Sequence, residues 1–342
     1  MGTITIKDVA KLCGVGVSTV SRAINNHPDI NEETKTKIMK IIKENNYIPN
    51  NSARNLKRSN SKMIAVLIKG ISNPFFSKMI KVIEEETQER KYSFLLHRVE
   101  ERDDEIDVAL ELVKEKKLRG IIFLGGFFTH SEEKLSQLDI PYVLCTVGIT
   151  GKWSKELCSF VAVDDFKESY KIVDYLCKIG HKRIAIITTS LDDTSIGLIR
   201  YKGYLQALRD NNIEPDMNLV RSMKDDIETF TMDNGYVVMK ELLESGEDFT
   251  AVFAISDSIA IGASKAILNA GKSVPDDYSV AGFDGLDIAS YYNPTITTIR
   301  QPVDEIAKEA VTILFDVIKK KADHQMCVFP GELIIGQSTK MI

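Results

Sequence analysis

The sequence predicts two folded parts: a small all-α head with a helix-turn-helix, and a larger α/β core with two lobes, each built on a doubly wound parallel sheet. Three observations lead to this fold class. Apolar residues repeat at helical spacing through residues 5–43. From Lys62 onward, apolar runs of strand length alternate with segments of helical spacing, which is typical of parallel sheets covered on both faces. This alternation comes in two successive series, the second of which begins near Asp165, and two series indicate two lobes.

The first two predicted helices form the helix-turn-helix. Thr5 is placed as the N-cap of the first helix and Asp8 as its capping-box partner, and Gly14 ends this helix. The second helix turns Val20 and Ile24 inward. Its outward face is short and mostly polar, and it consists of Val17, Ser18, Ser21, Arg22 and Asn25. Such a face can contact base edges and phosphates in a DNA major groove, whereas a plain pair of helices is the alternative that the spacing leaves open.

A third helix follows from Asn31, with acids in its first turn and lysines later, as the helix dipole favours. Its residues Ile38, Ile41 and Ile42 complete a small three-helix core. The head is basic, because residues 1–60 hold ten Lys and Arg against five Asp and Glu. The whole chain holds 44 against 49, so the remaining residues hold 34 against 44. A basic head on an acidic body is typical of a phosphate-binding module joined to one that does not bind DNA.

Composition and motifs exclude several other classes of protein. No run of eighteen apolar residues predicts a membrane span, and the polar N-terminus is unlike a signal peptide, so we expect a cytoplasmic protein. The five cysteines show no paired spacing and are expected to be reduced. There is no Gly-x-Gly-x-x-Gly after a strand, no P-loop, no metal-ligand cluster and no Ser/His/Asp arrangement. We therefore expect neither an enzyme nor a bound cofactor or metal.

Three motifs carry a family resemblance: Ile-Lys-Asp-Val-Ala at residues 6–10, Ser-Thr-Val-Ser-Arg at 18–22, and Tyr-Ile-Pro-Asn-Asn-Ser-Ala-Arg-Asn-Leu at 47–56. The sequence resembles the LacI/GalR family of bacterial transcription regulators, in the manner of lactose, galactose and purine repressors, and does so through almost the whole chain to Gln337-Ser-Thr.

The resemblance implies a particular organisation of the chain. It places a helix-turn-helix DNA-binding head at residues 1–48, a hinge helix and linker at 49–61, and a domain for effector binding and dimerisation at 62–342. That domain is expected to be periplasmic-binding-protein-like, and its chain crosses between the lobes near Val163, Asn293 and His324. The N-lobe then comprises about 62–162 and 294–324, and the C-lobe about 163–293 and 325–342.

The resemblance also nominates DNA contacts in the head. It implies base reading by Val17, Ser18 and Arg22, and contacts to the DNA backbone by Thr5, Thr19, Ser21, Asn25 and Tyr47. In the hinge, Ala53 and Leu56 are implied to enter the minor groove, with Leu56 as the wedge that bends the duplex. Residues 50–58 are too few for a stable helix alone in water, so we expect them to order only when paired with a second copy on DNA.

The effector site is predicted in a cleft where the carboxyl ends of the strands of both lobes meet. The candidates follow strands and match the family's ligand loops: Asn73, Phe76, Phe128, Ser195, Arg200, Phe230, Asp257 and Asp284. Carboxylates and a guanidinium suit vicinal hydroxyls, and aromatic rings suit the face of a sugar. Asp257 has an alternative as a helix cap. His97 and Arg98 favour an anionic ligand if they face the cleft.

The resemblance implies a homodimer that binds a pseudo-palindromic operator in double-stranded DNA and represses carbohydrate-uptake or catabolism genes until a small-molecule effector releases it. A regulator that needs a purine or another metabolite as corepressor is the alternative. A solute-binding protein of similar fold is the rival from another class, and the basic head and the lack of an export signal argue against it.

Overall fold

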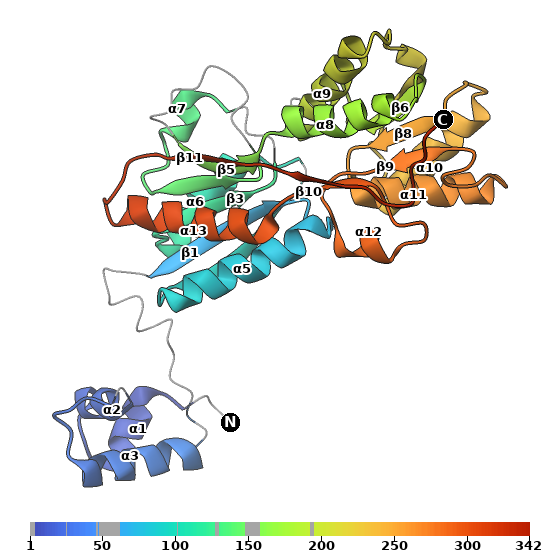
Figure 1. The fold of residues 1–342 in the computed structure, drawn as a ribbon. Helices are drawn as coiled ribbons and strands as arrows, with labels where there is room; N and C mark the ends of the chain where they lie inside the picture. Colours follow the sequence, from blue (N-terminus) through green and yellow to red (C-terminus); the bar gives the residue numbers. More distant parts are fainter. Residues whose placement is uncertain are drawn as a thin grey trace. The chain divides into compact units, whose positions relative to one another are not determined.

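The computed structural model describes residues 4–24, 26–45, 47, 62–100, 102–126, 130–147, 158–191 and 195–342 (Figure 1). Of the predicted site residues, Asn25, Ala53, Leu56 and Phe128 lie outside the described residues, as does the predicted hinge helix. The chain divides into two compact units, residues 1–61 and 62–342, which are treated separately below.

The first unit contains three helices: α1 (Ile6–Cys13), α2 (Val17–Ile24) and α3 (Glu32–Glu44). Thr5 caps α1 with both hydrogen bonds of the predicted capping box to Asp8, and Gly14 ends the helix at φ 69°. Asn31 caps α3 as predicted. The helices close around a small core of Val9, Ala10, Cys13, Val20, Ala23, Ile38 and Tyr47. This core fixes which side of α2 remains exposed.

The second unit begins with the N-lobe, whose six-stranded sheet has the order β11-β5-β4-β3-β1-β2. All of its paired strands are parallel: β1 (Met63–Lys69), β2 (Ser93–Val99), β3 (Gly120–Leu124), β4 (Tyr142–Cys145), β5 (Ser159–Val163) and β11 (Met326–Phe329). Helices α5 (Phe75–Glu89) and α13 (Val303–Ile318) cover one face, and α6 (Glu105–Lys116) and α7 (Glu132–Leu135) cover the other (Figure 1). Along β1, Ile64, Val66 and Ile68 pack toward α5 while Ala65 and Leu67 pack toward α6, as expected for a strand buried on both faces.

The C-lobe contains a four-stranded parallel sheet of order β7-β6-β8-β9. Its strands are β6 (Ile184–Thr188), β7 (Val220–Ser222), β8 (Ala251–Ala254) and β9 (Ser279–Ala281). Helix α8 (Asp165–Lys178) packs on α9 (Ile196–Asp210), and α10 (Met232–Glu244) packs on α11 (Asp257–Asn269). A 3-10 turn (Met217–Leu219) precedes β7, and the short helix α12 (Asp287–Tyr291) follows β9. The two parallel sheets and the helical head confirm the predicted fold class.

Two of the three predicted crossings between the lobes are misplaced. The strand β11 pairs with β5, where Phe329 lies opposite Val163, so residues 326–329 extend the N-lobe sheet. The third crossing therefore follows Phe329 and does not occur near His324. In the second crossing, the chain stays bonded to the C-lobe beyond Asn293, because the N–H of Gly282 donates to the carbonyl of Thr297 at 2.8 Å. That crossing comes after β10 (Thr298–Arg300), which forms an antiparallel ribbon with β12 (Glu332–Ile334).

None of the described helices combines the length and apolar character needed to cross a membrane. All five cysteines are free thiols, three of them buried, as predicted for small apolar side chains.

Candidate functional site

The exposed face of α2 is the candidate DNA-contact surface. Val17, Ser18 and Arg22 are exposed, and the side chain of Val17 retains 42% of its accessible surface. Thr19 and Ser21 are half-buried beside them, while Val20 and Ala23 anchor the opposite side of the helix in the core. The side chains predicted to read bases therefore share one outward face of a short helix, with Val17 and Ser18 in its first turn and Arg22 in its last.

Two residues predicted to contact the DNA backbone have other roles in the head. The hydroxyl of Thr5 is exposed and donates to Asp8 Oδ2 at 2.6 Å, within the capping box. Tyr47 is only 9% exposed, and its ring packs in the three-helix core. Burial of the ring stabilises the head, and contact of the Tyr47 hydroxyl with a phosphate stays a prediction.

A cleft between the lobes contains six of the eight predicted effector residues. These are Asn73, Phe76, Ser195, Arg200, Phe230 and Asp284. They come from loops and helix starts that follow β1, β6, β7 and β9, which is where a doubly wound sheet binds ligands. The lining is completed by Lys69, Gly70, Phe75, Gly125, Gly126, Thr146, Val147, Ile196, Glu228, Thr229 and Gln301.

Among the described residues, Arg200 is one of two buried cations that line this cleft, and Lys69 is the other. Its Nε donates to Asp165 Oδ1 at 2.8 Å, and its Nη1 lies 3.5 Å from Asp284 Oδ1. Nη1 also donates to the carbonyl of Ile255, and the guanidinium lies 3.7 Å from the centre of the Phe283 ring. Only 4% of Arg200 is exposed. The contacts from four directions hold the guanidinium plane in one orientation, as a fixed hydrogen-bonding group requires.

Asp284 is held in an unusual backbone conformation. Its φ is 107°, outside the region that residues other than glycine ordinarily adopt, and such strain is often found at ligand sites. Its Oδ1 accepts a hydrogen bond from Gln301 Nε2 at 2.9 Å. Burial raises the pKa of Asp284 to about 7, although Arg200 opposes the shift, and burial raises the pKa of Asp165 to about 6. Two carboxyls thus share one guanidinium at the floor of the cleft.

The N-lobe wall combines aromatic rings with polar groups. Phe75 and Phe76 pack edge to face, with ring centres 5.4 Å apart. Gly125 has φ 72°, and a Cβ there would lie 2.8 Å from Phe76 Cζ, so a larger residue would displace the ring. Asn73 Oδ1 accepts from the N–H of Phe75 at 3.1 Å and so fixes the loop that precedes α5. Across the cleft, Ser195 caps α9 and its hydroxyl lies 3.1 Å from that of Thr189.

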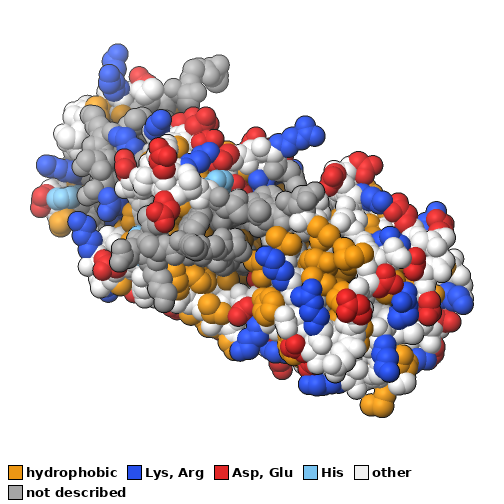
Figure 2. All heavy atoms as spheres, turned by 90° about the horizontal axis from the view of Figure 1, so that it is seen from above, with side chains coloured by type: hydrophobic (Ala, Val, Ile, Leu, Met, Phe, Trp, Pro, Cys, Tyr) orange, Lys and Arg blue, Asp and Glu red, His pale blue; other side chains and the backbone are white. Residues whose placement is uncertain are grey.

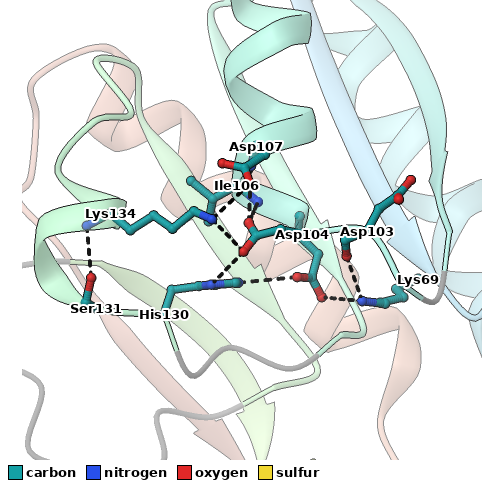
Figure 3. A network of polar contacts seen from close by, with 9 residues as sticks. Lys69, Asp103, Asp104, Ile106, Asp107, His130, Ser131 and Lys134 are labelled. Carbon is teal, nitrogen blue, oxygen red and sulfur yellow. Dashed lines mark hydrogen bonds and ion pairs between the residues drawn. The ribbon is translucent and has the colours of Figure 1, made fainter.

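Lys69 ends β1 at this wall and belongs to a charged network that extends away from the cleft (Figure 3). Its Nζ lies 3.4 Å from Glu105 and donates to the carbonyl of Asp103 at 3.0 Å. His130 lies between Glu105, at 3.2 Å, and Asp104, at 3.5 Å, and Lys134 contacts Asp104 at 2.6 Å. The two ammonium groups already pair with these carboxylates, which favours a salt-bridge network over a metal site even though Asp104, Glu105 and His130 lie close together.

The structure does not bring the remaining predicted residues into the cleft. Asp257 is wholly buried behind the cleft, where it accepts from the N–H of Leu286, and Ser256 rather than Asp257 caps α11. The prediction that Asp257 lines the cleft is therefore wrong. His97 and Arg98 do not line it either, and Arg98 pairs with Glu100 at 3.0 Å on the surface.

Sequence reasoning missed three residues of this site. Lys69 and Gln301 both follow or end strands, so the same strand-end rule could have nominated them. Asp165 had no such signal, because an acid at the start of a helix is usually a cap and its contact with Arg200 spans 35 residues of sequence.

Comparisons with known proteins agree with both units. Residues 5–50 match the family described as bacterial regulatory proteins, lacI family, and residues 173–339 match the periplasmic binding protein-like domain. The chain is 41% identical over 331 residues to the HTH-type transcriptional regulator MalR of Clostridium butyricum, a match that covers 96% of this chain and 97% of the relative.

Two solved structures show the same architecture. The lac repressor dimer bound to operator and the anti-inducer ONPF matches with a TM-score of 0.79 at 23% identity, covering 99% of this chain and 100% of that one, which is a likeness of fold. The complex of the transcriptional regulator CelR with cellobiose matches with a TM-score of 0.71 at 27% identity, covering 98% of this chain and 99% of that one. With this agreement along nearly its whole length, the chain belongs to the lacI family of bacterial regulatory proteins, which are DNA-binding transcription regulators and not enzymes.

Proposed function

We propose that this chain is a sequence-specific repressor of carbohydrate-uptake or catabolism genes, released from its operator when a small-molecule effector enters the cleft. The observation that carries the proposal is the outward face of α2, where Val17, Ser18 and Arg22 are exposed on a packed three-helix head. On the face of the molecule shown in Figure 2, the described Lys and Arg side chains are interspersed with Asp and Glu side chains and do not form a broad basic patch.

Within this proposal, residues 1–48 form the head and 49–61 the hinge and linker. Val17 and Arg22 read base edges, with Arg22 suited to the paired acceptors of guanine, and Ser18 assists them. Thr5, Thr19, Ser21 and Asn25 contact the backbone, and Ala53 and Leu56 enter the minor groove. A cytoplasmic homodimer places two heads on a pseudo-palindromic operator, because its two-fold axis matches that of the site.

The effector that suits the cleft best is a neutral carbohydrate. The rings of Phe76 and Phe230 can pack on a sugar face, and Asp284, Arg200 and Asn73 can bond to hydroxyls. The buried cations are already balanced, since Lys69 faces Glu105 and Arg200 faces two carboxyls. His97 and Arg98 lie away from the cleft, so the argument for an anionic ligand loses its support. The CelR relative, whose structure holds cellobiose, supports the same class of ligand.

Replacing Arg22 by alanine is expected to weaken operator binding by roughly 5- to 150-fold, corresponding to about 1–3 kcal/mol for a lost bidentate base contact. The operator is first selected from a random duplex pool with the wild-type protein, and affinities for the selected and a scrambled duplex are then measured at fixed salt. Lys40→Ala is the matched control, because it removes the same charge from the exposed side of α3. Equal losses on both duplexes in the Arg22 variant would contradict base reading.

Thermal unfolding against neutral sugars, sugar phosphates and nucleobases tests the cleft. A true effector at about 100 times its Kd should stabilise the protein by roughly 2.7 kcal/mol, and it should release the selected operator. Asp284→Asn should abolish that shift at pH 7.5, because most of the wild-type carboxyl, its pKa being about 7, is ionised there and can accept effector hydroxyls, whereas asparagine mimics only the neutral acid. Asp287→Asn, an exposed acid three residues away, should keep the shift. A response confined to sugar phosphates or nucleobases would reject the neutral carbohydrate, and tighter operator binding would make the effector a corepressor.

A further inference from the structure

The carboxyl of Asp257 lies directly beneath the turn that carries Asp284. Its Oδ2 accepts the N–H of Leu286 at 2.7 Å, and its own backbone N–H donates to the carbonyl of Phe283 at 2.7 Å. A Cβ at Gly282 would lie 2.3 Å from Asp257 Oδ1, so the carboxyl fills the space under the start of the turn. Asp257 therefore contacts the turn on both sides of Asp284, whose φ of 107° needs outside support.

This carboxyl has no cation to balance a negative charge. Asp257 is wholly buried, its Oδ1 has no hydrogen-bond partner, and no described Lys, Arg or His forms an ion pair with it. The charged group that faces it is Asp284, and Arg200 is already shared between Asp284 and Asp165. A buried carboxylate with one unsatisfied oxygen and an acid beside it is strongly disfavoured, and the neutral acid costs much less free energy there.

We propose that Asp257 is a positioning residue of the effector cleft which keeps its proton in the folded protein, so that the turn is supported without a second negative charge and Asp284 can ionise to accept effector hydroxyls. The part that concerns the effector rests on the proposed function. The groups around Asp284 act on it in opposite senses: Arg200 from α9 and Gln301 favour its charged form, whereas Asp165 from α8 disfavours it. Burial and the neighbouring Asp284 raise the pKa of Asp257 to about 8, although the Thr298 side chain and the N–H groups of Leu286 and Gly285 oppose the shift, and the raised value agrees with a retained proton.

The first test needs no effector. Carboxyl 13C NMR of aspartate-labelled full-length protein, with signals assigned by Asp257→Asn and Asp284→Asn, should show Asp257 protonated at pH 7 and titrating near pH 8. Because the two sites interact, the Asp284 signal of the wild type should show a further step near pH 8, and Asp257→Asn should remove that step while the effect of Asp165 on Asp284 stays the same in both proteins. A signal of Asp257 that is already ionised at pH 6 would overturn the proposal, as would an Asp284 titration that the Asn variant leaves unchanged.

The second test compares the thermal midpoints of Asp257→Asn and wild type from pH 5 to 9. The ordinary pKa of 3.8 applies in the unfolded chain, so the stability of the wild type should fall as the pH rises from about 4 to about 8 and then level off. Asparagine mimics the neutral acid, so the difference in midpoint should grow in favour of the variant by roughly 5 °C between pH 6 and 8. Asp287→Asn is the control, and its thermal midpoint should change with pH in the same way as that of the wild type. A difference that does not change with pH would mean a merely structural role.

The third test measures the binding of cellobiose or ribose, and it asks whether Asp257 positions Asp284 for the effector. If either sugar binds the wild type, its affinity should fall above pH 8 as Asp257 ionises, and Asp257→Asn should remove that fall. An affinity that falls equally in both proteins would overturn the positioning role. If neither sugar binds while the Asp284 signal shows the step near pH 8, the choice of sugar in the proposed function has failed and the role of Asp257 stands.

Discussion

Replacing Arg200 by alanine should lower the unfolding free energy of the 62–342 unit by about 3–5 kcal/mol at pH 8, because breaking a buried ion pair leaves uncompensated charge. The variant would strand Asp165 and Asp284, which are only 5% and 4% exposed, without their shared cation. It would also remove the donor to the carbonyl of Ile255. Urea unfolding at pH 8, followed by circular dichroism, measures the effect.

The loss should shrink when the same unfolding is measured at pH 5. Both carboxyls have raised pKa values, about 6 for Asp165 and about 7 for Asp284, and without Arg200 these would rise further. Each carboxyl with a raised pKa contributes stability that is lost as the pH rises through its folded pKa. The variant should therefore lose the most unfolding free energy above pH 7 and the least below pH 6. Arg183→Ala is the matched control: it breaks ion pairs of a side chain that is 40% exposed and should cost about 1 kcal/mol or less. A loss from Arg200→Ala that is equal at both pH values would show that packing, and not charge, dominates.

The strand-end rule and the resemblance to the family's ligand loops together placed Asn73 and Asp284 at the cleft, and the resemblance placed Arg200 there. In a doubly wound sheet, the residues after buried strands are carried to one edge whatever the details of packing, and two lobes bring two such edges together. The strand-end rule also placed Phe76 at the cleft, and the family resemblance placed Phe230 there. The alternation of fully apolar strands with helices was sufficient for the fold class for the same reason.

The local pattern could not predict which distant segment of the chain a given strand or side chain contacts. Residues 326–329 are a short strand that could extend either sheet, and pairing with β5 placed it in the N-lobe. Asp257 follows β8 as the rule requires, yet the turn at Gly282–Leu286 covers it, and that contact lies 29 residues away in sequence. Each error concerns a long-range contact that tertiary packing decides.

Residues of the cleft are hydrogen-bonded to residues next to the crossings between the lobes, so a bound effector could change how the lobes are arranged. Gln301 donates to Asp284 and precedes α13 of the N-lobe, while Asp165 binds Arg200 just after the chain leaves β5. An effector hydroxyl that bonds to Asp284 or Arg200 would therefore compete with the hydrogen bonds that these two residues make to Gln301 and Asp165. Gln301 and Asp165 each lie next to a crossing between the lobes. Any change in operator affinity must equal the difference in effector affinity between the two arrangements of the lobes.

Replacing Ile38 by alanine should abolish operator binding by unfolding the head while leaving the 62–342 unit intact. Ile38 is wholly buried at the centre of the three-helix core, and an Ile→Ala change in a core costs about 2–5 kcal/mol. A core this small rarely supplies more than about 3–5 kcal/mol in total, so the loss consumes most of the head's stability. Calorimetry of the full chain should show the head's transition lost and the main transition unchanged, since the two units are separate compact bodies.

The neighbouring residue provides the control. Met39 lies one position further along α3 and is 45% exposed, so Met39→Ala removes a side chain of similar size from the surface and should cost little. Operator affinity should then remain near that of the wild type. If Ile38→Ala kept full operator affinity, the head would have to draw its stability from outside the three-helix core. If the main transition shifted with it, the two units would not fold independently, and the separation of DNA contact from effector sensing would fail with them.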